Sequence, residues 1–142
     1  VYTLSMEYTW EDLVIAAEWQ QFEQDYEAHS DAMGAVVRAQ NDISRGYYIQ
    51  ASYRFTELFS LGAYYSVFYP DKDDKDGTNN TFKSDAWEKD YALTMRFDIN
   101  EYCIFKVEGH YVDGTARVLT QDNTDRTRDD FTYGVAKVTF SF

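Results

Sequence analysis

Residues 46–69, GYYIQASYRFTELFSLGAYYSVFY, decide the fold, because apolar and polar side chains alternate through them on either side of a short break near Glu57. The apolar positions are Tyr47, Ile49, Ala51, Tyr53 and Phe55 before the break and Phe59, Leu61, Ala63, Tyr65, Val67 and Tyr69 after it. A period of two is typical of β-strands that have one apolar face. The stretch therefore predicts two strands joined by a tight turn.

The same alternation recurs on both sides of this hairpin. Its apolar positions are Tyr2, Leu4, Met6, Tyr8 and Trp10; Leu13, Ile15, Ala17 and Trp19; Trp87, Tyr91, Leu93, Met95, Phe97 and Ile99; Cys103, Phe105, Val107, Gly109 and Tyr111; and Thr132, Gly134, Ala136, Val138, Phe140 and Phe142. The composition agrees, with 13 Tyr, 10 Phe and 3 Trp against 1 Pro, since rings favour strands and proline is kept out of sheet interiors. We expect an all-β fold of about seven antiparallel strands.

The predicted connections alternate between two kinds. Tight breaks fall near residues 11, 57 and 100, and long polar loops are expected at residues 28–45, 70–85 and 119–130. Rings cluster at both ends of the strands: Trp10, Phe55, Phe59, Phe97, Tyr102, Phe140 and Phe142 near the breaks, and Trp19, Tyr47, Tyr69, Trp87, Tyr111 and Phe131 near the loops. Short turns on one side, long loops on the other and two aromatic girdles are typical of outer-membrane barrels.

The second face of the predicted strands is charged. It carries Glu7, Glu18, Arg54, Glu88, Asp90, Arg96, Asp98, Lys106, Glu108, His110 and Lys137. A dry core could not hold so many charges, because burying each costs several kcal/mol, whereas a water-filled lumen could. We therefore predict an antiparallel transmembrane β-barrel whose lumen these residues line.

The carboxy-terminal sequence resembles a known group of proteins. Residues 137–142, KVTFSF, with Phe140 and Phe142 in alternation, resemble the assembly signal that the barrel-insertion machinery reads in Gram-negative outer-membrane proteins. Residues 46–77 and 97–116 are similar to the last hairpins of porin-like proteins, and the likeness is best over residues 46–142. The pattern departs at Cys103, where such proteins often have an aromatic residue.

This resemblance implies a location and a set of partners. The location is the bacterial outer membrane, and the partners are its lipid, the barrel-insertion machinery and small hydrophilic solutes. Whether the protein forms a homo-oligomer is left open.

The number of predicted strands bears on whether they can close a barrel by themselves. Seven strands begin and end in the same direction, whereas bacterial single-chain barrels close with even numbers. We expect at least one more strand upstream, unless the loop at residues 28–45 hides strand pairing. Residues 1–142 would then be the C-terminal portion of a single barrel domain of about 16 strands.

Other functions find little support in the sequence. A net charge of −12 argues against nucleic acid. Cys103 stands alone, so it makes no internal disulfide and no thiolate metal site. The acidic residues 71–76, DKDDKD, fail the EF-hand pattern, since Gly77 in the glycine place leaves Lys72 at the first ligand position. No catalytic motif is present, so we expect neither an enzyme nor a cofactor.

Three functions remain to be weighed. The first is a porin-like channel for passive diffusion of small hydrophilic solutes, in which the mixed charges set a transverse field. The second is a structural barrel that sheathes or docks another envelope protein, its lumen plugged and its charges pairing across strands. The third, a soluble ligand-binding barrel of lipocalin type, is disfavoured by the two girdles.

Overall fold

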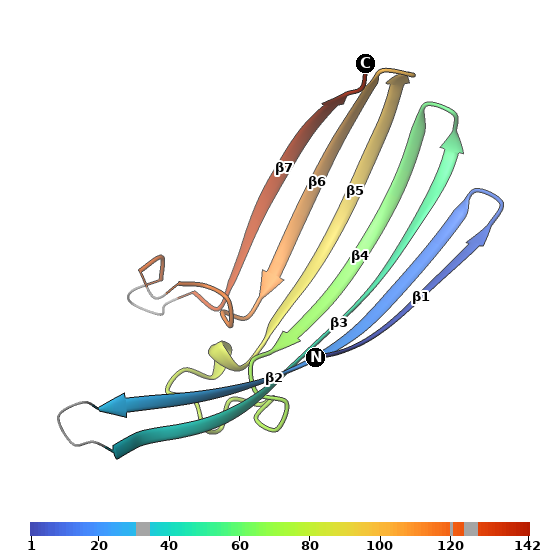
Figure 1. Ribbon diagram of the computed structural model, residues 1–142. Coiled ribbons are helices and arrows are strands. Elements are labelled where there is room, and N and C mark those ends of the chain that lie inside the picture. Colours follow the sequence, from blue (N-terminus) through green and yellow to red (C-terminus); the bar gives the residue numbers. More distant parts are fainter. Residues whose placement is uncertain (31–34, 120, 124–127) are drawn as a thin grey trace.

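The computed structural model describes residues 1–30, 35–119, 121–123 and 128–142, with the backbone alone for residues 24–30 and 35–42. The described chain forms one antiparallel sheet of seven strands in the order β1-β2-β3-β4-β5-β6-β7 (Figure 1). The elements are β1 (Tyr2–Trp10), β2 (Leu13–Ser30), β3 (Ala35–Thr56), β4 (Phe59–Tyr69), the 3-10 helix η1 (Lys83–Ala86), β5 (Glu88–Asn100), β6 (Cys103–Asp113) and β7 (Asp130–Phe140). The prediction of an all-β fold with seven antiparallel strands is confirmed.

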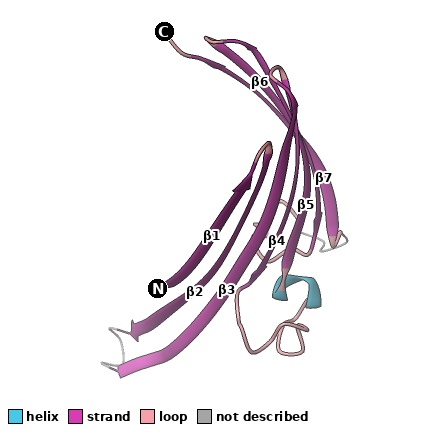
Figure 2. Cartoon of the chain, turned by 90° about the vertical axis from the view of Figure 1, so that its right-hand side faces the viewer, coloured by secondary structure: helices cyan, strands magenta, loops and turns pink. Residues whose placement is uncertain are grey.

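The three tight turns lie together at one end of the sheet (Figure 1). Each leaves two residues between paired strands, at 11–12, 57–58 and 101–102. Glu11 adopts a positive φ of 51°, a conformation that is common in two-residue hairpin turns. At the opposite end lie η1 and the described residues of the two connections after β4 and β6, namely 70–87 and 114–119, 121–123 and 128–129 (Figure 2). The predicted contrast between short turns and long loops is confirmed for these two connections.

The register keeps the alternation in phase from strand to strand. Ile49 on β3 lies opposite Ala17 on β2 and Tyr65 on β4, and Tyr65 lies opposite Tyr91 on β5. One face, here called the apolar face, is consequently apolar over most of its area, and the other, the polar face, holds the charges. Six large apolar residues of the predicted alternating pattern all lie on the apolar face: Leu4, Ile15, Ile49, Leu61, Leu93 and Val107.

No second layer covers the apolar face within the described part of the chain. Leu4, Ile49 and Leu93 are 71%, 52% and 54% exposed. Exposed apolar area of this extent marks a surface that meets a partner or a membrane. The sheet therefore lacks the closed hydrophobic core of a water-soluble sandwich.

Aromatic rings form two rows across the sheet. Near the tight turns, ring centroids of Phe59 lie 6.0 Å from Phe55 and 5.2 Å from Phe97, and Phe97 lies 6.1 Å from Phe105. Near the loops, the centroid of Tyr91 lies 4.8 Å from Tyr65 and 6.2 Å from Tyr111. Cross-strand ring pairs of this kind stabilise sheets by about 0.2–1 kcal/mol each.

One predicted girdle residue was placed wrongly. Phe131 lies opposite Val112 on the polar face, because it is two residues from Tyr133 and side chains two apart on a strand share a face. Its ring lies 6.1 Å from that of Tyr133.

The long loop predicted at residues 28–45 is wrong. β2 runs to Ser30 and β3 begins at Ala35, and the two pair along this length with one irregularity between Ala28 and His29. Residues 31–34 lie outside the described residues. Alternation marks only strands that have one apolar face, whereas main-chain hydrogen bonds pair strands of any composition. The extra pairing lengthens the β2–β3 hairpin and adds no eighth strand to the described sheet.

The loop after β4 is less solvated than predicted. Asp74 is only 3% exposed, and its carboxylate accepts hydrogen bonds from Thr78 N and Oγ1 at 2.8 Å, Asn79 N at 3.0 Å and Asn80 Nδ2 at 3.0 Å. Burial by itself raises the pKa of Asp74, but these hydrogen bonds outweigh it and hold the pKa below its ordinary 3.8. Part of the third predicted loop, residues 120 and 124–127, lies outside the described residues.

Candidate functional site

The polar face is hollowed into a groove. A space of about 790 Å³ is lined by residues from β1 to β6, among them Arg54, Tyr64 and Glu108. Every residue predicted to line a lumen lies on this face by register: Glu7, Glu18, Arg54, Glu88, Asp90, Arg96, Asp98, Lys106, Glu108, His110 and Lys137. Successive side chains of a strand point to opposite faces, so residues an even number of positions apart on one strand share a face.

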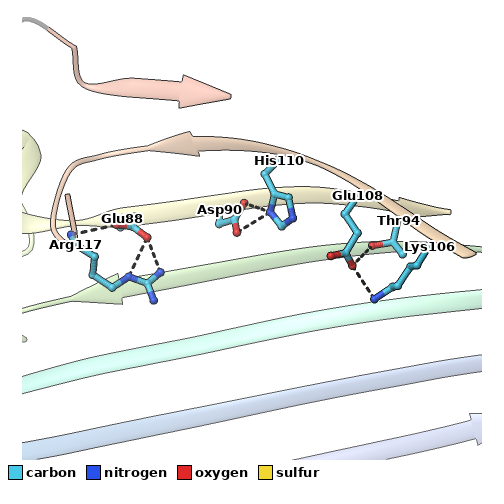
Figure 3. Close-up of polar contacts among 7 residues, drawn as sticks. All are labelled: Glu88, Asp90, Thr94, Lys106, Glu108, His110 and Arg117. Atoms are coloured by element: carbon cyan, nitrogen blue, oxygen red, sulfur yellow. Dashed lines mark hydrogen bonds and ion pairs between the residues drawn. The ribbon is translucent and has the colours of Figure 1, made fainter. Parts of the chain in front are cut away.

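Four acid–base pairs follow one another along β5 and β6 (Figure 3 shows three of them). From the loop end they are Glu88 with Arg117, Asp90 with His110, Glu108 with Lys106, and Asp98 with Arg96. The last two join residues two apart on one strand, at N···O distances of 2.7 and 2.6 Å. Glu108 also accepts a hydrogen bond from Thr94 Oγ1 at 3.1 Å.

The pair of His110 and Asp90 is the most enclosed of those without a loop residue. Each side chain is 12% exposed, and His110 Nδ1 lies 3.0 Å from both carboxylate oxygens of Asp90 (Figure 3). The Tyr133 ring stacks on the imidazole, with centroids 4.3 Å apart and planes 6° from parallel. The hydrogen bond and the stacked ring together fix the imidazole orientation.

The charges nearer the tight turns have other partners. Arg54 Nε and Nη2 lie 3.0 and 2.9 Å from Asp12 Oδ1. Glu18 accepts a hydrogen bond from Ser5 Oγ at 2.8 Å.

Three predicted residues make no ion pair in the described structure: Glu7, Glu18 and Lys137. Glu7 and Lys137 are exposed, and Lys137 stands directly opposite Lys106.

Sequence reasoning missed the arginine that completes the series. Arg117 follows the end of β6 in a connection, so strand alternation says nothing of its direction. Its Nη2 lies 2.5 Å from Glu88 Oε1, and its Cζ lies 5.4 Å from the centre of the Phe68 ring on β4. Asp12 was missed for the same reason, because it lies in a tight turn. Neither position carries a sequence pattern that would reveal its partner.

The arrangement offers fixed charges along a groove. A transverse field of this kind, inside a low-dielectric wall, acts on small charged solutes. Among the described residues, no group of three or more His, Cys, Asp or Glu side chains is placed to hold a metal ion. No helix in the described ranges is long and apolar enough to cross a membrane.

Comparison with known proteins yields a structural likeness only. No family model and no curated protein sequence matches the chain. A solved structure of the NanC porin, in a rhombohedral crystal form, matches it with a TM-score of 0.62 and 15% sequence identity, over 99% of this chain and 61% of that one.

The chain has the fold of part of a porin barrel. At 15% identity the likeness extends to the fold alone, and the chain spans less than two thirds of the structure it matches. The predicted porin-like architecture of the sheet is thereby confirmed.

Proposed function

We propose that the chain forms part of the wall of a channel in the bacterial outer membrane, through which small hydrophilic solutes diffuse without chemical change. The observation that supports this most is the division of one sheet into two contrasting faces. Within the described part of the chain no layer covers the apolar face, which bears two rows of rings. The polar face bears a groove with paired charges. Lipid outside and water inside account for both faces at once.

The proposal names further partners and a wider assembly. The protein would be inserted by the barrel-insertion machinery, which would read Phe140 and Phe142. Strands beyond the described sheet would complete the barrel, because β1 and β7 do not pair with each other and an open sheet edge is not stable in lipid. Further copies of the chain could surround it as a homo-oligomer, which cross-linking in native membranes would detect.

The experiment measures ion selectivity of the whole protein in planar bilayers across a salt gradient. Arg54→Gln together with Arg96→Gln leaves Asp12 and Asp98 without their bases. The reversal potential should shift toward cations, and most at low ionic strength, because salt screens fixed charges over about 10 Å at 0.1 M. The matched control replaces two cations of the loop after β4, Lys72→Gln and Lys83→Gln, and should shift it less.

The structural alternative makes the opposite prediction. A barrel that sheathes or docks another envelope protein would insert into bilayers yet conduct no ions. Normal insertion without conductance would therefore refute the channel proposal and support the structural barrel.

A further inference from the structure

Residues 114–118, here called the strap, turn back over the polar face after β6. Arg117 Nε and Nη2 lie 2.9 and 2.5 Å from Glu88 Oε1 on β5 (Figure 3). Arg117 Cζ lies 5.4 Å from the centre of the Phe68 ring on β4. β5 and β4 are the first and second neighbours of β6. Because strands lie about 4.8 Å apart, the strap and its arginine reach across roughly 10 Å of this face.

The strap is held in place by its own backbone. Four successive N–H groups donate to fixed acceptors: Gly114 to Asp129 O at 2.7 Å, Thr115 to Ser84 O at 2.7 Å, Ala116 to Trp87 O at 3.2 Å and Arg117 to Glu88 Oε2 at 3.1 Å. The Thr115 hydroxyl donates to Asp85 Oδ1 at 2.7 Å and lies 3.1 Å from Ser84 Oγ. Moving the strap would break several of these bonds together and leave their buried donors without partners, which opposes such a movement.

The residues around the strap are almost fully buried. Val112, Thr115 and Ser84 are 2%, 3% and 6% exposed. Gly114 has a φ of 99°, and a Cβ at that position would collide with the Trp87 carbonyl oxygen. The chain therefore enters the strap through a conformation and a contact that only glycine accommodates.

Arg117 is far more exposed than its partner Glu88. The arginine side chain is 55% exposed and that of Glu88 only 10%. A solute that passes the loop end of the polar face consequently meets the guanidinium first. Arg117 Nη1 makes no hydrogen bond within the described structure, so it has donors available for an anionic or polar group.

We propose that the strap is a fixed constriction at the loop-side mouth of the pore, and that Arg117 determines the width and charge of that mouth. The strap adds a layer of atoms over the sheet wall, which narrows the passage, and its exposed guanidinium favours anions there. The inference rests on the proposed channel function.

The first experiment compares single-channel conductance and reversal potential of the whole protein in planar bilayers. Arg117→Ala should raise the conductance and shift the reversal potential toward cations, and Arg117→Lys should keep the reversal potential close to that of the unchanged protein. The matched control is Lys75→Ala, which removes a loop cation lying 5.2 Å over the Tyr69 ring on the apolar face. If Arg117→Ala behaves like Lys75→Ala, the strap inference is overturned while the channel stands. If the unchanged protein does not conduct, the channel proposal fails and the strap inference falls with it.

The second experiment tests whether the strap is fixed. Ser84→Cys with Thr115→Cys, in a Cys103→Ser background, replaces two hydroxyl oxygens 3.1 Å apart, close enough for a disulfide after a small shift. The cross-link should form under oxidising conditions, and conductance should be the same before and after reduction. Failure to cross-link, or a conductance that rises on reduction, would overturn a strap that already lies across the mouth.

Discussion

Charged residues on the polar face are paired mainly within short distances along or between neighbouring strands. Arg96 with Asp98 and Lys106 with Glu108 are two residues apart on one strand, where both side chains point to the same side. Such exposed pairs add little stability, typically 0–1 kcal/mol. Their contribution is to fix charge positions along the groove. Ion pairs that hold neighbouring residues of the wall together can therefore also create a field across a passage.

Asp74 is the residue at which loop stability should depend on pH. Its pKa is lowered in the folded loop, so the stabilisation is complete above its ordinary 3.8 and is lost as the pH falls through the lower folded value. Asp74→Asn should therefore make residues 70–80 more sensitive to proteolysis at neutral pH. The difference between variant and unchanged protein should shrink toward pH 3.

Asp73→Asn is the matched control for this prediction. Asp73 is a neighbour whose side chain is 75% exposed, and it bonds to Lys72 at the surface. The Asp73→Asn substitution should leave the proteolytic sensitivity of residues 70–80 almost unchanged. Equal effects of the two substitutions at neutral pH would contradict the role given to the Asp74 hydrogen bonds.

The strands were largely predictable, and the reasons are local. Alternation through residues 46–69 gives β3 and β4 their faces, and the same rule places Ile49 and Leu93 outward. It failed at residues 28–45, where main-chain pairing extends β2 and β3 without an apolar stripe.

The residues of the site could be predicted only where they lie on strands. The polar-face residues follow from alternation, but Arg117 and Asp12 lie in connections. Their positions follow from backbone hydrogen bonds such as Thr115 N to Ser84 O, between residues far apart in sequence. No pattern within a single segment encodes such a contact.

Substitution by arginine should destabilise the protein much more at one residue of β3 than at its neighbour. Ile49 is 52% exposed on the apolar face, and Gln50 is on the polar face next to it. Ile49→Arg should lower the free energy of unfolding from lipid vesicles by about 2–4 kcal/mol, because it places a charge in hydrocarbon. Gln50→Arg should change it by less than about 1 kcal/mol, as is usual for exposed polar sites. A denaturant titration measures both, and equal values would show that the apolar face does not meet lipid.

At the scale of the whole molecule, insertion should depend on the last aromatic residues. Phe140 and Phe142 are 67% and 115% exposed at the tight-turn end, and no described residue covers them. Exposed rings at a strand end are available to be bound by another protein, in the way that extended segments add to a sheet edge. We expect removal of Phe142 from the whole protein to reduce the amount in the outer membrane while leaving synthesis unchanged, as measured by fractionation and total protein. Leu58→Ala is the control, since Leu58 is 60% exposed at the same end but lies in a turn outside the alternating segment. Normal insertion after loss of Phe142, or an equal defect from Leu58→Ala, would mean that the machinery reads some other feature of the sheet.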